Sequence, residues 1–181
     1  WVHKTEEMDQ AVLADWKKQG AMQKILDGRF WSCPGVFSWD RIDDGSQVLI
    51  NHLPKNVHGK VADLGAGWGF LSDFLLRNHE DITLLELFEA DRVSLECARR
   101  NLGLVQVKLR PQYHWLDVTR GLDTKTSYDF VIMNPPFHEG RQAHPLLGAK
   151  FIATAARSLR VGGHLWMVAN RPPPHEQYLD E

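Results

Sequence analysis

Residues 61–69 of the chain read VADLGAGWG, a short apolar run that passes directly into three closely spaced glycines. The apolar run predicts a buried strand at 61–64, and the amphipathic residues that follow predict a helix over 69–78. Glycines between the two allow a tight bend and a close approach of the backbone to a ligand. The stretch therefore predicts a ligand-binding strand–loop–helix unit. A plain tight turn is the alternative for a glycine loop that stands alone.

Short apolar runs and longer amphipathic segments alternate along the rest of the chain. This alternation indicates a Rossmann-like, doubly wound, mostly parallel α/β sheet, in which the ligand lies outside the carboxyl ends of the strands. The loops after the strands are therefore expected to carry the chemistry. Further strands are predicted at 82–88, 105–109, 128–133 and 164–169, and further helices at 91–102 and 145–159.

The first 54 residues follow a weaker pattern. Apolar residues near one helical face predict a helix over 6–27, which Gly20 weakens. Residues 28–44 carry glycine, proline and paired aspartates and are expected to be irregular. A short helix is predicted at 46–53, ended by Pro54.

Composition narrows the class of protein. The chain has 181 residues with 43% hydrophobic content, which fits one compact domain. A formal net charge of −2 gives no support for a nucleic-acid partner bound by non-specific phosphate contacts, although a local basic patch is compatible with one. Two widely separated cysteines argue against a zinc motif and favour free thiols in a cytoplasmic protein. We expect no metal, no membrane span and a monomer.

An acidic residue follows the second predicted strand at an informative distance. Glu89 lies 20 positions after Gly69, the range at which a carboxylate meets ribose hydroxyls. Glu86 is expected to face the sheet or a helix, and Asp91 to cap the following helix. The spacing D-x-G-x-G-x-G also differs from the G-x-G-x-x-G of dehydrogenases, which cradles a pyrophosphate. Glu89 is therefore the preferred ribose ligand, and a dehydrogenase is disfavoured.

The strand predicted at 128–133 runs directly into Asn134-Pro135-Pro136-Phe137. The two prolines fix their own φ, remove two backbone donors and favour an extended Asn134, so the loop is stiff and its carbonyls are free acceptors. The Asn134 side-chain oxygen and the Pro135 carbonyl can each accept one N–H of a planar amine, and Phe137 can stack on its plane. Such a site acts mainly by positioning the nitrogen for an in-line displacement. A proline-stiffened loop with a core phenylalanine is the alternative.

These motifs resemble those of class I S-adenosylmethionine-dependent methyltransferases. The tetrapeptide is similar to that of members that methylate planar nitrogens, namely adenine N6, guanine N2 or the amide of glutamine. The chain most resembles the ribosomal RNA small subunit guanine-N2 methyltransferase family. The similarity is carried by NPPFH at 134–138, PGVFS at 34–38, DDGSQVL at 43–49 and VAN at 168–170.

The resemblance implies S-adenosylmethionine as cofactor and methyl transfer to guanine N2 in RNA of the small ribosomal subunit. An acidic residue after the third strand typically accepts from the adenine amino group, a role that matches Asp117; a solvated turn aspartate is its alternative. The implied catalytic residues are Asn134, Pro135, Pro136 and Phe137. The implied cofactor-binding residues are Asp63, Gly65, Ala66, Gly67, Gly69, Glu89, Ala90, Asp117, Val118 and Asn134. The implied substrate-binding residues are Phe137, His138 and Arg141.

The resemblance covers residues 34–181. Residues 1–33 are expected to be a helix and linker left from a preceding domain, and the catalytic domain at 34–181 to lack the antiparallel strands that usually close this sheet. An N-methyltransferase acting on adenine N6 or on a protein glutamine is the first alternative. A non-catalytic, methyltransferase-like RNA-binding module is the second.

Overall fold

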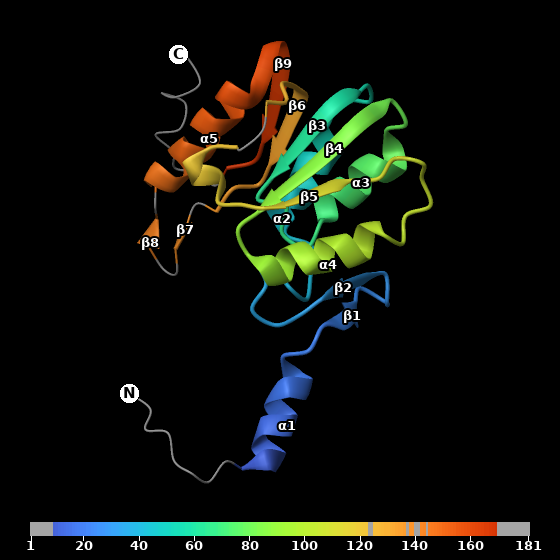
Figure 1. Cartoon of the computed structure of the whole chain (residues 1–181), viewed down its shortest axis with the longest axis vertical. Coiled ribbons are helices and arrows are strands. Elements are labelled where there is room, and N and C mark those ends of the chain that lie inside the picture. Colours follow the sequence, from blue (N-terminus) through green and yellow to red (C-terminus); the bar gives the residue numbers. More distant parts are fainter. Residues whose placement is uncertain (1–8, 123–124, 137, 140–141, 144, 170–181) are drawn as a thin grey trace.

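The structure, a computed structural model, contains one five-stranded parallel sheet in the order β5–β4–β3–β6–β9 (Figure 1). Because β3 pairs with both β4 and β6, the strand order reverses beside β3, as in a doubly wound sheet. The strands are β3 (Gly59–Leu64), β4 (Ile82–Glu89), β5 (Gln112–Trp115), β6 (Tyr128–Met133) and β9 (Leu159–Met167). The described residues are 9–122, 125–136, 138–139, 142–143 and 145–169.

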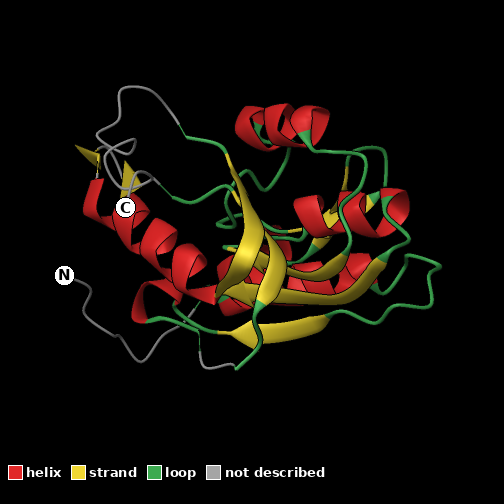
Figure 2. Ribbon diagram, turned by 90° about the horizontal axis from the view of Figure 1, so that it is seen from above, coloured by secondary structure: helices red, strands yellow, loops and turns green. Residues whose placement is uncertain are grey.

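Helices cover both faces of the twisted sheet (Figure 2). Successive residues of β3 face opposite sides, so Val61 packs into one apolar cluster and Ala62 and Leu64 into another. The first cluster is completed by α2 (Asp44–His52), α3 (Phe70–Asn78) and α4 (Arg92–Leu102). The second is completed by α5 (Pro145–Ser158) and the 3-10 helix η1 (Val118–Arg120). The predicted fold class is thus confirmed.

The helix predicted over 6–27 is wrong in its second half. Helix α1 (Gln10–Gln19) ends at Gly20, and a hairpin of β1 (Gln23–Ile25) and β2 (Phe30–Ser32) follows, which also replaces part of the segment expected to be irregular. Buried Asn101 of α4 bonds to both backbone groups of Trp31, so tertiary contacts override the helical spacing. In Figure 1, α1 extends away from the sheet, and none of its residues is buried.

The third strand was predicted at 105–109, and this is also wrong. Those residues form turns whose apolar side chains pack against the core, whereas the strand is the more polar β5. Its His114 stacks on Phe88 and donates from Nε2 to Glu86 (2.7 Å), a buried carboxylate that also accepts from Tyr128 Oη (2.8 Å). Glu86 therefore faces neighbouring strands, as expected. Cross-strand polar bonds of this kind leave no apolar signal in the sequence.

Strand β9 begins five residues before the predicted strand at 164–169 and ends two residues before its end. A short antiparallel pair, β7 (His138–Glu139) and β8 (Gln142–Ala143), was not predicted. In the described part of the chain no helix has the length and apolar character to cross a membrane, and no cluster of His, Cys, Asp and Glu could hold a metal ion.

Candidate active site

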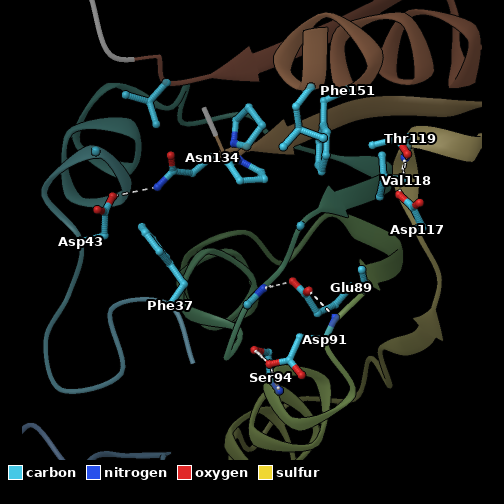
Figure 3. Close-up of a pocket in the computed structure, with 18 of the residues that line it drawn as sticks. Phe37, Asp43, Glu89, Asp91, Ser94, Asp117, Val118, Thr119, Asn134 and Phe151 are labelled. Atoms are coloured by element: carbon cyan, nitrogen blue, oxygen red, sulfur yellow. Dashed lines mark hydrogen bonds between the residues drawn. The ribbon is translucent and has the colours of Figure 1, made fainter. Parts of the chain in front are cut away.

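A cavity of about 720 Å³ lies where the strand order reverses, and residues that follow all five strands of the sheet line it (Figure 3). Its position is the one expected for the ligand of a doubly wound sheet, and its volume suits a small molecule. From the strand ends it takes Gly65, Gly67, Glu89, Ala90, Asp91, Leu116, Asp117, Val118, Thr119, Asn134, Pro135, Pro136, Val168 and Ala169. From elsewhere it takes Gly35, Phe37, Asp43, Asp44, Gly45, Ser94, Leu147 and Phe151.

The glycines of the loop have two roles: some line the cavity, and one allows two helices to pack closely. Gly65 and Gly67 line the cavity with φ of 73° and 54°, a region that side-chain-bearing residues rarely adopt. Gly69 does not line it. A Cβ atom there would lie 3.0 Å from the Cβ of Ala98, so this glycine lets α3 and α4 approach each other. Ala66 faces a smaller adjoining cavity. Of the predicted cofactor residues in this loop, the structure thus brings two to the main cavity.

Glu89, the last residue of β4, links this strand to the glycine loop that follows β3. One carboxylate oxygen accepts from the Gly67 backbone N–H (2.8 Å), and the other accepts from the Asp91 N–H (2.8 Å). Each oxygen keeps a second lone pair for a ligand. Asp91 caps α4, as expected, by accepting from the Val93 and Ser94 amides (3.0 and 3.2 Å). Glu89 is therefore both a support of the glycine loop and a hydrogen-bond acceptor at the cavity.

Asp117 lines the cavity after β5, directly before η1. Its Oδ1 accepts from the backbone N–H and the hydroxyl of Thr119 (2.9 and 2.7 Å), which holds the carboxylate at the cavity. Beside it, Leu116 and Val118 provide apolar surface for a planar ring. The predicted pair of Asp117 and Val118 therefore lies where a base-like group could be held by one polar and one apolar contact.

Asp63 lies beneath the glycine loop and does not line the cavity. Its side chain is fully buried, and Oδ2 accepts from Ser72 Oγ (2.6 Å) while Oδ1 has no partner in the described structure. Burial raises the pKa of this carboxyl to about 7, and the nearby Glu89 carboxylate adds to the rise. Asp63 thus links β3 to α3 through Ser72, and it is not among the residues that line the cavity.

Asp63→Asn should change the pH dependence of stability. The folded protein retains this proton up to about pH 7, whereas the ordinary pKa is 3.8, so the contribution is full below pH 3.8 and is lost as the pH rises to about 7. The free energy of unfolding of the wild type, measured with urea, should therefore fall by about 1.4 kcal/mol per pH unit relative to that of the variant across that window. A difference that stays constant with pH would contradict the assignment.

The Asn-Pro-Pro loop forms the wall opposite Glu89. Asn134, Pro135 and Pro136 all line the cavity, and Pro135 is buried. The Asn134 Nδ2 atom donates to Asp43 Oδ2 (2.7 Å) and to Ser46 Oγ (2.9 Å). Phe137 and Arg141, two predicted substrate-binding residues, lie outside the described residues, and of His138 only the backbone in β7 is described.

Sequence reasoning missed Asp43, Ser46 and Phe37 as site residues. Phe37 is 67% exposed at the cavity, facing the same space as Asn134 (Figure 3). The motifs PGVFS and DDGSQVL contain all three, but these motifs supported only the resemblance to a family and gave no role to the individual residues. A usable signal was the helix cap, because aspartate is a preferred residue directly before the first turn of a helix, and Asp43 accepts from the Ser46 amide in that position.

The charge at the cavity is of one sign. Five carboxylates line it, and among the described residues no lysine or arginine does: Asp43, Asp44, Glu89, Asp91 and Asp117. A pyrophosphate would be repelled by these groups, whereas a ligand with a cationic centre would be attracted. The cavity is thus unsuited to a dinucleotide and suited to a cation that carries hydroxyl and base-like groups.

A parallel sheet with a glycine loop after β3 and an Asn-Pro-Pro loop after β6, which meet in one acidic cavity, has the Rossmann-like architecture of class I methyltransferases. The family model of the methyltransferase small domain matches residues 27–181. The chain belongs to this family.

Relatives and solved structures agree with this placement. The ribosomal RNA small subunit methyltransferase C of Pasteurella multocida is 33% identical over 170 residues, covering 94% of this chain and 50% of the relative. That of Citrobacter koseri is 34% identical over 176 residues, covering 96% and 49%. The T. thermophilus 16S rRNA N2 methyltransferase, solved with AdoMet and guanosine, is 31% identical with a TM-score of 0.71, covering 88% of this chain and 44% of that one. The chain thus spans about half the length of these proteins.

Proposed function

We propose that the chain transfers a methyl group from S-adenosylmethionine to the exocyclic N2 of a guanine in RNA of the small ribosomal subunit. The observation that carries this is the meeting of Asn134 and Glu89 across one acidic cavity. The names of the matched relatives and the guanosine bound to the T. thermophilus enzyme support the choice of guanine and of ribosomal RNA. The RNA or the small subunit is then the partner.

The described residues fit the cofactor. S-adenosylmethionine supplies an electrophilic methyl group on a positively charged sulfur, and the five carboxylates of the cavity favour that charge. The Gly67 and Asp91 amides hold the Glu89 carboxylate at the cavity, and each oxygen keeps a free lone pair. Glu89 would therefore accept hydrogen bonds from the ribose hydroxyls. Asp117 would accept from the adenine amino group, with Val118 against the ring. The small residues Gly65, Gly67 and Ala90 would let the ligand approach the backbone closely.

The Asn-Pro-Pro loop would hold the acceptor. The Asn134 Oδ1 atom and the Pro135 carbonyl each accept one N–H of the guanine amine, which leaves the nitrogen lone pair directed at the methyl group. The prolines contribute no competing donor. The gain comes from orientation of the two reactants, so no strong general base is required if the proton leaves after the methyl arrives. Phe137, His138 and Arg141 complete this proposal on the substrate side.

Adenine N6 and glutamine amides present the same two N–H donors, so methyl transfer itself must choose among the acceptors. The chain is incubated with methyl-labelled cofactor and either unmodified small-subunit RNA or the subunit's proteins, followed by nucleoside and amino-acid analysis. We expect the label in N2-methylguanosine. Label in adenosine or in glutamine would overturn the guanine assignment. Cofactor binding by calorimetry without transfer to any acceptor would instead favour the non-catalytic RNA-binding module.

A further inference from the structure

We propose that Asp43, assisted by Ser46, is the positioning residue that fixes the Asn134 amide with its oxygen toward the substrate amine. The inference rests on the proposed function for the identity of that amine. A primary amide has two N–H donors and one oxygen acceptor. Both donors of Asn134 are used, one on Asp43 Oδ2 (2.7 Å) and one on Ser46 Oγ (2.9 Å). Only the oxygen is left to face the cavity.

Asp43 decides the orientation because an ionised carboxylate only accepts hydrogen bonds. If the amide were turned over, Asn134 Oδ1 would lie beside the Asp43 oxygen, and two acceptors would replace a short, charge-assisted bond. The Ser46 hydroxyl can donate or accept, so by itself it would tolerate either orientation. Figure 3 shows the Asn134 nitrogen directed at Asp43, with the oxygen turned away from it.

The Asp43 carboxylate is itself held in place. The same Oδ2 accepts from the Ser46 backbone N–H (3.0 Å) as the cap of α2. At Gly45 an added Cβ would lie 3.0 Å from that oxygen and 3.3 Å from Val168, so the missing side chain leaves the room in which the carboxylate sits. The start of α2 thus places a fixed acceptor behind Asn134, from a segment 91 residues earlier in the chain.

The orientation determines which acceptors can be methylated. An exocyclic amine offers only N–H donors to Asn134, so an amide turned over would present N–H to N–H and repel it. The Asp43 contact therefore selects an amine over a carbonyl or ring nitrogen at this position. This role also explains why a charged residue, Asp43, lies beside the Asn-Pro-Pro loop although it has no direct part in the methyl transfer.

The test compares D43S with D44S. Serine caps helices about as well as aspartate, so α2 should be retained. Its hydroxyl is shorter than the aspartate side chain and can donate as well as accept, so it no longer excludes the reversed Asn134 amide. Asp44 lines the same cavity without bonding to Asn134, so D44S measures the loss of a carboxylate alone. We expect D43S to lose about tenfold to 100-fold more kcat than D44S, while the two share the same change in cofactor Kd. Equal kcat values would overturn the proposal.

A double-mutant cycle separates positioning from a general structural role. If Asp43 acts through Asn134, D43S should have almost no further effect on kcat in the N134A background. Full additivity would contradict the inference. S46A should cost less than D43S, because the remaining carboxylate still excludes the reversed amide; a greater loss would assign the role to Ser46.

A readout without turnover keeps the inference distinct from the proposed function. In protein labelled with 15N-asparagine, the side-chain NH₂ signals of Asn134 are identified by their absence from N134A. Slow hydrogen exchange of this pair in the wild type and faster exchange in D43S, but not in D44S, are expected. Fast exchange in the wild type would overturn the positioning. A wild type that shows the slow exchange yet methylates no RNA would refute the proposed function alone.

Discussion

Asn134→Ala should lower kcat for methyl transfer at least about 100-fold while cofactor affinity stays within several-fold. The variant removes the amide oxygen that accepts the substrate amine, and Glu89 and the glycine loop on the opposite wall are left unchanged. Single-turnover transfer and calorimetric titration of the cofactor, on the same protein sample, measure the two quantities.

The control is N51A, an exposed asparagine of α2 with no contact to the cavity. It should behave as the wild type in both assays. A large loss of cofactor affinity in N134A, with kcat retained at saturation, would place Asn134 among the cofactor ligands and remove it from the substrate side.

Glu89→Ala should have the reverse effect and weaken cofactor binding first. The carboxylate makes two charge-assisted bonds, to the Gly67 and Asp91 amides, and is proposed to bind the ribose hydroxyls as well. Bonds of this type contribute about 1.5–3 kcal/mol each, so Kd should rise by at least about tenfold. At saturating cofactor, kcat should remain within several-fold of the wild type.

Calorimetry measures this affinity, with E96A as the control. Glu96 is a half-exposed carboxylate of α4 that does not line the cavity. If E89A binds the cofactor as tightly as E96A does, the ribose role of Glu89 is refuted.

The parts of the site that the sequence predicts are those whose geometry is local. The glycine loop and the Asn-Pro-Pro loop each follow directly from a strand, so a contiguous motif specifies both the backbone and the side chain at the cavity. Glu89 was found because a strand–helix–strand unit fixes the spacing between the ends of two adjacent parallel strands. The alternation of strands and helices along the chain likewise suffices to predict the fold class, which the five-stranded sheet confirms.

The parts that could not be predicted depend on contacts between distant segments. The bond between Asp43 and Asn134 joins residues 91 positions apart. The hairpin after α1 forms because Asn101 bonds to Trp31, and β5 forms where Glu86 anchors His114. In each case a polar contact across the fold outweighs the local apolar pattern on which the sequence prediction relied.

The arrangement of acceptor and donor is tested most directly by a crystal structure of the chain with guanosine and sinefungin, an S-adenosylmethionine analogue with an amine in place of the transferred methyl group. We expect the guanine N2 within about 2.7–3.2 Å of Asn134 Oδ1, with the analogue's ribose hydroxyls on Glu89. A guanosine bound with N2 turned away from Asn134, or an analogue outside the cavity between Asn134 and Glu89, would contradict the account.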